Sequence, residues 1–411
     1  MGALHERDFA LLFAGQSVSV LGDRLVMVAM PFAVLSVPGA GAADVGLVLG
    51  ASALTLALFV LVGGVWADRL PRHLTMLASD VVRAVAQGAT AALLLTGHAT
   101  VWRLVVLQAV FGAAEAFFRP AVLGLVPQVT RADRLQEANA LLALTSNLAL
   151  MVGPAVAGLL VATVGAGAAL AIDAATFVVS ALTLLPMRPH PIPAPDVGKS
   201  SFTDELRGGW HEVRGRSWVW SVILAFAAYH TFVLPGVFVL GPLVSEELRG
   251  GASSWGLIST GFGVGAALGS VLALRWRPHR PGVVIGVLLA VASSQAAICA
   301  SPLPTLAVAA LEAVTGVAVS VLFTVWETAL QEHIPQAAQA RVSSFDYLGS
   351  LTLMPLGLVV IGPLGHLIGN VPTAVLATGL SLTVSLLAAA GRPLRDLRPA
   401  TPAPAGPAPR P

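Results

Sequence analysis

The stretch GGVWADRLPRH, from Gly63 to His73, lies between two long apolar runs. It carries the charged residues Asp68, Arg69 and Arg72. Charged residues gather in the short loops between membrane helices, because a charge inside the bilayer is costly. The stretch therefore predicts a loop with a membrane span on each side.

The composition of the whole chain supports a membrane protein. Of its 411 residues, 56% are hydrophobic and 11% are charged, and the mean hydropathy is +0.83. This leaves too little polar surface to solvate a globular fold. A span across about 30 Å of hydrocarbon needs roughly 20 apolar residues, and its backbone groups must pair within the helix. We therefore expect an all-α membrane protein.

Twelve apolar runs of this length are predicted. They cover residues 9–35, 44–66, 74–96, 101–124, 138–163, 166–187, 218–243, 253–274, 282–300, 304–330, 344–368 and 371–390. The first run has no cleavage site after a short apolar core, so it is expected to be retained as a span. The predicted organisation is an N-terminal six-helix bundle (1–188), a cytoplasmic linker (189–216), a C-terminal six-helix bundle (217–392) and a disordered Pro/Ala-rich tail (393–411).

The basic residues predict the orientation. Loops on the side of the N-terminus contain Arg69, Arg72, Arg131, Arg134, Arg188, Lys199, Arg207, Arg214, Arg216, Arg275, Arg277, Arg280 and Arg341, whereas the opposite loops contain little beyond Arg249. Basic loops stay in the cytoplasm, so we expect an inner-membrane protein with both termini cytoplasmic. Orientation also explains the net charge of +2 better than nucleic-acid binding does.

An internal repeat relates the two halves. Val126-Pro127-Gln128 returns as Ile334-Pro335-Gln336, and Gly153-Pro154 returns as Gly362-Pro363. The offsets are nearly equal, so they indicate two duplicated six-helix halves. Parallel repeats of this kind place a substrate path between the halves, near the midplane of the membrane.

From Phe9 to about Arg392 the chain resembles the major facilitator superfamily. The loop motif of that family, G-x-x-x-D-R-x-G-R-R/K, is matched by Gly64, Asp68, Arg69 and Arg72, while Pro71 and His73 depart from it. The resemblance implies a conformational lock in which these charges engage neighbouring helix ends. The alternative is that the arginines only fix the topology.

A second family motif, typical of exporting members, is matched in LMVGPAVAG by Gly153, Pro154 and Gly158, although Leu159 replaces its last glycine. Ordinary small-residue packing would explain these residues equally well. The N-terminal FALLFAGQSVSVLGD and the segment LQEHIPQAAQARVSS resemble the branch with bacterial macrolide-efflux proteins and the enterobactin exporter. The basic residue that the family has in the fourth span is replaced here by Gln108.

Ionisable residues at membrane depth are candidates for transport chemistry. Asp23 is the strongest, because it lies well inside the first span and shares a helical face with Gln16 and Ser19. It is predicted to take up and release a proton as access alternates. The rival interpretation is a static ion pair with Arg24 or another helix.

The resemblance places the fourth and tenth spans at the central cavity as well. Glu115 and Arg119 are spaced i and i+4 on the face of Gln108, so they can neutralise each other. In the tenth span we select Glu312, which is deep, and Glu327, which is closer to the cytoplasmic end. We interpret Asp173 and the Asp80–Arg83 pair as structural.

The remaining residues argue against catalysis. The single cysteine, Cys299, excludes an intrachain disulfide, and neither a P-loop nor a metal-ligand spacing is present. We expect no enzymatic activity, cofactor or metal, and energy from an ion gradient. The leading hypothesis is a monomeric, proton-coupled exporter (an antiporter) of hydrophobic or amphipathic small molecules such as drugs, antibiotics or siderophores. The alternatives are a metabolite importer or facilitator, a lysophospholipid transporter and a non-transporting receptor or scaffold.

Overall fold

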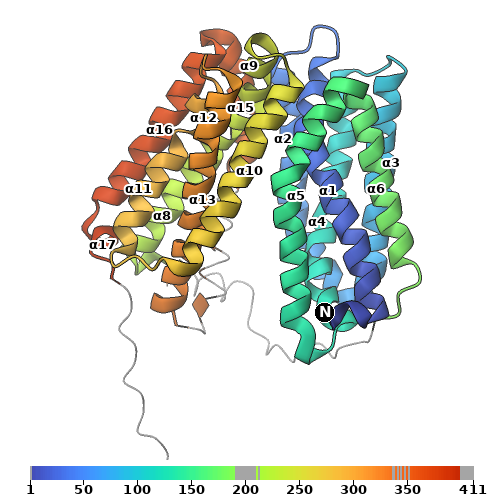
Figure 1. Ribbon diagram of the computed structural model, residues 1–411, viewed down its shortest axis with the longest axis horizontal. Helices are drawn as coiled ribbons and strands as arrows, with labels where there is room; N and C mark the ends of the chain where they lie inside the picture. Colours follow the sequence, from blue (N-terminus) through green and yellow to red (C-terminus); the bar gives the residue numbers. More distant parts are fainter. Residues whose placement is uncertain are drawn as a thin grey trace, which may run out of the picture.

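A computed structural model shows an almost entirely helical chain (Figure 1). It describes residues 2–189, 210–211, 213–335, 338–339, 342, 345–346, 349 and 352–398, with the backbone alone for 61–69. No β-strand occurs in this part of the chain. The predicted linker lies largely outside the described residues.

The first bundle contains six long helices. They are α1 (Arg7–Leu35), α2 (Ala42–Arg69), α3 (Arg72–Leu95), α4 (Val101–Val129), α5 (Leu135–Val164) and α6 (Ala166–Leu184), with the short turns η1 (Ala3–His5) and η2 (Ala132–Arg134) beside them. Within the bundle, α1 packs on α5 and α6, whereas α4 packs on α2 and α3.

The second bundle follows the same order, with two interrupted spans. Its helices are α8 (Ser217–Ala228), η3 (Tyr229–Val233), η4 (Gly236–Leu240), α9 (Gly241–Leu248), α10 (Ala252–Arg275), α11 (Pro281–Ser293), α12 (Gln295–Cys299), α13 (Thr305–His333), α15 (Met354–Ile368), α16 (Asn370–Ala390) and α17 (Arg392–Arg395). The elements α8 to α9 form the seventh span, and α11 with α12 forms the ninth.

The predicted fold class is confirmed, and each of the twelve predicted spans overlaps a described helix. Ten helices in the described chain are long and apolar enough to cross a membrane, and α15 is a shorter apolar helix. The predicted boundaries differ in places. The fourth span continues to Val129, and the described part of the eleventh helix begins at Met354.

Helix α3 has the length of a span but a polar buried face. Its buried residues include Thr75, Ser79, Asp80, Arg83, Gln87 and Thr90, whereas Leu74, Val81, Val82 and Val85 are exposed. A bilayer favours this inverted arrangement, because lipid solvates the apolar face and the bundle interior must satisfy the polar one. The polar face of α3 therefore defines the interior chemistry of the first bundle.

The seventh span contains two π-helical turns, which were not predicted. The Leu234 N–H donates to the Tyr229 carbonyl, and the Gly241 N–H donates to the Gly236 carbonyl, each five residues back. Pro235 lies between the turns and has no N–H to donate, so the regular ladder is interrupted there. Single π turns inside α-helices often accompany functional sites.

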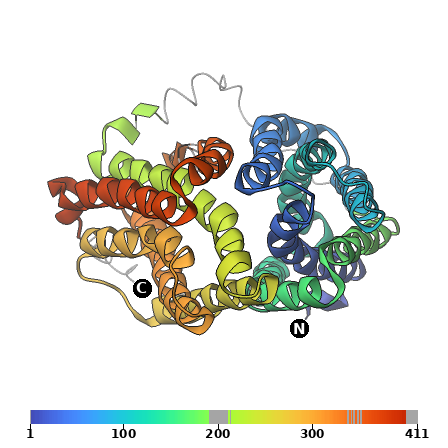
Figure 2. The same cartoon turned by 90° about the horizontal axis from the view of Figure 1, so that it is seen from above.

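The two bundles meet mainly through two pairs of helices, α5 with α10 and α2 with α15 (Figure 2). Close approaches between the bundles include Gly158 with Gly256 and Gly46 with the Leu358 carbonyl. These contacts lie toward the end of the bundles opposite the N-terminus, and the bundles diverge toward the N-terminal end (Figure 1). Helix α1 also contacts the second bundle, at α9, α10 and η4.

The C-terminal tail begins later than predicted. Residues 392–395 form a helical turn, and both Leu394 and Leu397 are buried in the core of the second bundle. The hydrophobic effect holds these two leucines in place. The prediction of disorder from residue 393 is therefore wrong for 393–398, and the later residues lie outside the described chain.

Candidate functional site

The first bundle contains a buried ion pair within α3, between Asp80 and Arg83, on the face that packs on α6. Arg83 donates to Asp80, and the Ser180 hydroxyl donates to the second Asp80 oxygen at 2.6 Å. The Arg83 guanidinium also lies over two aromatic rings, 4.0 Å from the Phe118 centroid and 4.4 Å from the Phe177 centroid. A buried charge pair persists when most of its remaining hydrogen-bonding capacity is met. These neighbours provide that for Asp80 and for the face of the guanidinium, whereas the Arg83 Nε has no hydrogen-bond partner.

A chain of amides links three helices beside this pair. Gln108 of α4 donates to the Gln87 Oε1 of α3 at 3.2 Å, and Gln87 donates to the Asp173 Oδ2 of α6 at 2.9 Å. The second oxygen, Asp173 Oδ1, lies 3.5 Å from the Thr176 hydroxyl. That hydroxyl is committed to the Asp173 backbone carbonyl at 2.7 Å. Gln108, selected as a cavity residue, therefore belongs to the bundle interior.

Asp23 lies next to this network without joining it. No described residue forms a hydrogen bond or ion pair with its carboxylate, although Arg83, Glu115, Arg24 and Arg119 act on it electrostatically. Its neighbour Gly22 packs directly on Asp173 and Thr176, where a side chain would collide with both. The predicted static ion pair between Asp23 and Arg24 is not present in this conformation.

Arg24 connects the acid on α1 to the glycine-proline motif on α5. A Cβ atom on Gly153 would lie 3.0 Å from Arg24 Cγ, so the glycine makes room for the arginine stem. The buried Arg24 Nε has no hydrogen-bond partner. Gly158 and Pro154 of the same motif contact Gly256 in the other bundle. The motif thus lies between the acid and the interface of the two bundles.

The pair predicted in the fourth span is present. Arg119 donates to one Glu115 oxygen through Nε at 2.9 Å and Nη2 at 2.5 Å. The Arg119 side chain is 54% exposed and Glu115 is 20% exposed. An exposed pair of this kind contributes little to stability.

The second bundle buries a carboxylate among neutral groups. Glu312 of α13 is 1% exposed, and its oxygens accept from Gln295 at 2.8 Å, Thr315 at 3.1 Å and the Cys299 thiol at 3.5 Å. Gln295 in turn accepts from the Tyr229 hydroxyl at 2.7 Å. Tyr229 begins the π turn η3, so this cluster joins the irregular seventh span to the ninth and tenth spans.

The other predicted residues are placed differently. Glu327 is exposed on α13 and is not part of the Glu312 cluster. Gln16 is buried, and its Nε2 has no partner. It lines a cavity of about 230 Å³ between α1, α4 and α5, together with Asn139, Thr145 and Ser146.

The predicted lock is described in part. Arg72 donates to the Gly124 carbonyl of α4, so α3 is tied to the neighbouring helix at its first residue. Gly64, Asp68 and Arg69 lie in the segment whose side chains are outside the description. Their role stays a prediction.

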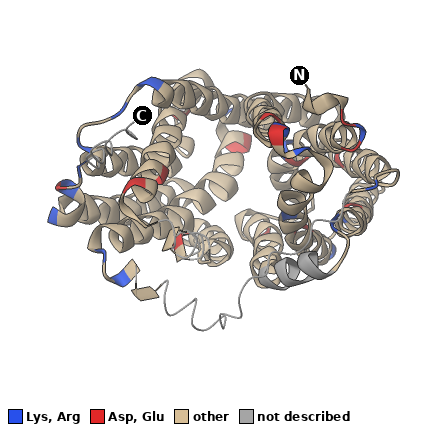
Figure 3. Ribbon diagram, turned by 90° about the horizontal axis from the view of Figure 1, so that it is seen from below, with Lys and Arg blue, Asp and Glu red and all other residues tan. Residues whose placement is uncertain are grey.

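Sequence reasoning did not select Tyr229 or Gln295, and it treated Asp173 as structural. For Asp173 a signal was available, because it is an acid within an apolar run. For Tyr229 and Gln295 no signal was available in the sequence, because the hydrogen bond between them depends on the π turn. No cluster of three or more potential metal ligands occurs in the described residues, and charges are sparse on the helices (Figure 3).

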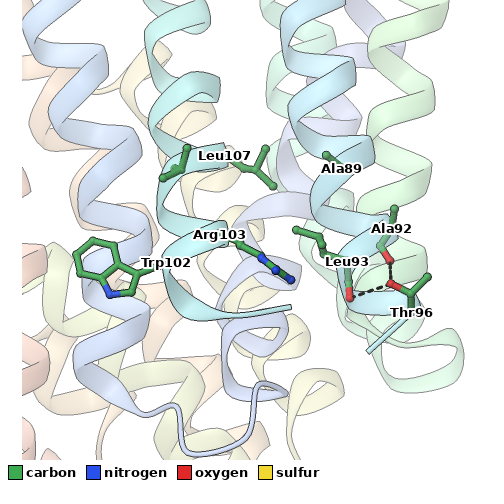
Figure 4. A pocket seen from close by; sticks show the side chains of 8 residues that line it. Ala89, Ala92, Leu93, Thr96, Trp102, Arg103 and Leu107 are labelled. Carbon is green, nitrogen blue, oxygen red and sulfur yellow. Dashed lines mark hydrogen bonds between the residues drawn. The ribbon is translucent and has the colours of Figure 1, made fainter. Parts of the chain in front are cut away.

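A further cavity lies away from these acids. It is a crevice of about 640 Å³ on the outer side of the first bundle, between α3 and α4 (Figure 4). Its walls are almost entirely apolar. A third cavity, of about 210 Å³, lies between α5, α10 and α13 and is lined by Asn147, Phe262 and Ser320.

Two bundles of membrane-length helices, joined at one end and enclosing a few buried acids, define an integral multi-pass membrane protein of the transporter class. The family model of the Major Facilitator Superfamily matches residues 12–349. The chain belongs to this family, and it is a transporter rather than an enzyme.

Characterised relatives and solved structures agree. The chain is 30% identical over 397 residues to the multidrug efflux pump Tap of Mycolicibacterium fortuitum, covering 92% of each chain. It is 25% identical over 382 residues to the enterobactin exporter EntS of Shigella boydii, covering 92% of this chain and 89% of the other. A bacterial homologue of the lysosomal transporter Spinster, solved in an inward-facing, unoccupied conformation, has a similar fold with a TM-score of 0.74 at 16% identity, covering 98% of this chain and 100% of that one.

Proposed function

We propose that this transporter is a proton-coupled exporter of hydrophobic or amphipathic small molecules, working as a monomer in the inner cell membrane with both termini cytoplasmic. The observation that carries the proposal is the placement of Asp23. It is a carboxylate deep in the first span that forms no hydrogen bond or ion pair with any described residue. Asp23 is half-buried, and an acid without a fixed partner can change its protonation state without breaking a structural contact.

The surroundings of Asp23 suggest how protonation is coupled to movement. The adjacent Arg24 passes over Gly153, and the next turn of that helix contacts Gly256 across the bundle interface. Neutralising Asp23 changes the electrostatic force on Arg24, and with it the packing of α1 on α5. Since α5 carries one of the two contacts between bundles, the charge state of Asp23 biases the rocking of one bundle on the other.

Export rather than uptake is supported by the relatives, which include a multidrug efflux pump and an enterobactin exporter. The mostly apolar helices with few charges suit amphipathic substrates. Cytoplasmic termini follow from the basic loops. With that orientation, the bundles diverge toward the cytoplasm in this conformation.

The test uses everted membrane vesicles and the fluorescent dye ethidium. The wild-type protein is expected to accumulate ethidium only while a proton gradient is maintained. Asp23→Asn is expected to lose this uphill accumulation while still permitting downhill ethidium flux. The matched control is Asp44→Asn. Asp44 lies in the first turn of α2 and accepts a hydrogen bond from the Gly41 N–H, and an asparagine side chain can accept the same bond.

Two results would overturn the proposal. Proton-driven accumulation that is unchanged in Asp23→Asn would remove Asp23 from coupling. Ethidium flux in the wild type that is insensitive to collapse of the proton gradient would favour a facilitator.

A further inference from the structure

The apolar crevice between α3 and α4 opens on the membrane-facing side of the first bundle (Figure 4). Ala89, Ala92 and Leu93 line it from α3, and Val106 and Leu107 line it from α4. Val106 is 59% exposed, so this wall faces lipid. The two alanines create the space, because a larger side chain there would fill it. A hydrocarbon chain is the natural occupant of such a surface.

The polar groups inside the crevice are already used. The Thr96 hydroxyl donates to the Ala92 carbonyl at 2.7 Å and lies 3.5 Å from the Leu93 carbonyl. The body of the crevice therefore offers no hydrogen bond to a ligand. Recognition by charge can come only from its mouth, where Arg103 lies.

The position of Arg103 near the N-terminus of α4 favours the binding of an anion beside its guanidinium. Arg103 is the third residue of α4, close to the positive end of the helix dipole, where a positive charge is disfavoured. Its Nη1 donates to the His98 carbonyl at 2.7 Å, and the Arg103 side chain forms no other hydrogen bond or ion pair with the described residues. The guanidinium thus retains donors that match a phosphate.

A second arginine, Arg249, differs from Arg103 in the number of backbone carbonyls that its guanidinium contacts. Arg249 directs its guanidinium at the backbone carbonyls of Cys299, Ser301 and Leu303. These contacts use Nε, Nη1 and Nη2, so the Arg249 guanidinium stabilises the loop from Cys299 to Leu303. Arg103 has one such carbonyl, which leaves it available for a ligand.

We propose that this crevice is a binding site for one phospholipid with an anionic headgroup. An acyl chain lies between α3 and α4, and the phosphate accepts hydrogen bonds from Arg103. The neighbouring Trp102 is 69% exposed, as expected for an aromatic residue at the level of the headgroups. The bilayer supplies such a ligand continuously, and the charge at the mouth selects an anionic headgroup over a zwitterionic one. The proposal does not depend on the transported substrate or on proton coupling.

The test is local photocrosslinking, because anionic lipids also bind the basic loops. The full chain is placed in phosphatidylcholine nanodiscs that contain a small fraction of either phosphatidylglycerol or phosphatidylcholine bearing a diazirine in one acyl chain. Crosslinked peptides are mapped by mass spectrometry. Labelling of Ala89–Leu93 and Trp102–Leu107 is expected to be about fivefold stronger with the phosphatidylglycerol probe, given the usual contribution of one arginine near an anionic headgroup.

Two variants test recognition of the headgroup and binding of the acyl chain separately. Arg103→Gln is expected to equalise the two probes. Ala92→Leu is expected to suppress labelling of the crevice by both. Ala78→Leu is the matched control, because Ala78 is an exposed alanine of α3 outside the crevice, and its labelling is expected to equal that of the wild type.

Equal labelling of the wild type by both probes, or a retained preference in Arg103→Gln, would overturn the proposal. So would loss of crevice labelling when saturating ethidium is added, since that result would identify the crevice as a substrate entry rather than a lipid site.

Discussion

Gly158 and Gly256 bring the backbones of α5 and α10 into contact across the two bundles. A Cβ atom on either glycine would lie 2.8 Å from the Cα of the other. The related contact on the opposite side involves Gly362 of α15 and the Ala42 carbonyl of α2. The repeated glycine-proline pairs therefore belong to the two helices, α5 and α15, through which each bundle contacts the other.

Gly158→Leu is expected to separate the bundles at this end, because the leucine would overlap backbone atoms that cannot move aside. With spin labels at Val164→Cys and Leu248→Cys, the distance distribution is expected to shift to longer values, and ethidium transport is expected to fall. The native cysteine, Cys299, is buried and so does not compete for label.

The control for this experiment is Gly379→Leu, because a Cβ atom at Gly379 meets nothing within 4 Å. It is expected to leave both the distances and transport unchanged. An unaltered distance distribution in Gly158→Leu would show that the glycine contact does not hold the bundles together.

Two arginine pairs of the first bundle are expected to differ in stability. Arg83→Met leaves Asp80 buried without its cation, which costs about 3–5 kcal/mol. Arg119→Met removes a largely exposed pair, which costs roughly 0–1 kcal/mol. The free energy of unfolding in mixed micelles, followed by far-UV circular dichroism during an SDS titration, measures both. Equal losses would contradict the distinction between a buried and an exposed pair.

The amide chain gives a third prediction. Gln87→Leu removes the donor to Asp173 and the acceptor of Gln108 at once. The groups left unsatisfied are expected to lower the free energy of unfolding by about 1–3 kcal/mol each. Gln136→Leu is the control, because Gln136 is exposed on α5. The same SDS titration applies, and equal stability of Gln87→Leu and the control would show that the chain contributes nothing.

The fold was predictable because the features that define it, long apolar runs and the distribution of basic residues, can be recognised along the sequence and follow directly from the cost of placing polar groups in a bilayer. Apolar runs of membrane length and basic loops define helices and their order without any contact being known. The depth of Asp23 and the spacing of Glu115 and Arg119 follow from the geometry of one helix. The sequence alone already indicated the glycine-proline repeat.

Contacts between helices were harder to predict. Gln108 was placed at a cavity, yet it donates to Gln87, because the rotation of α4 is set by packing on α2 and α3. The meeting of Tyr229, Gln295 and Glu312 depends on a π turn and on a break at Ser294, and neither has a clear pattern in sequence. The closeness of Gly158 to Gly256 depends on the relative position of two bundles that transport is expected to change.

Glu312 provides the last prediction, since its described partners are all neutral. Glu312→Gln keeps an acceptor for Gln295 and Thr315, whereas Glu312→Leu leaves several donors unsatisfied. Glu312→Leu is therefore expected to be less stable than Glu312→Gln by about 1–3 kcal/mol in the SDS titration. Because the described partners of Glu312 include no cation, we expect it to take part in proton coupling, so Glu312→Gln is expected to lower proton-driven ethidium accumulation without unfolding. Glu327→Gln, at an exposed position of the same helix, is expected to transport normally. Normal accumulation by Glu312→Gln would leave Glu312 as a structural hydrogen-bond acceptor and Asp23 as the stronger candidate for the coupling acid.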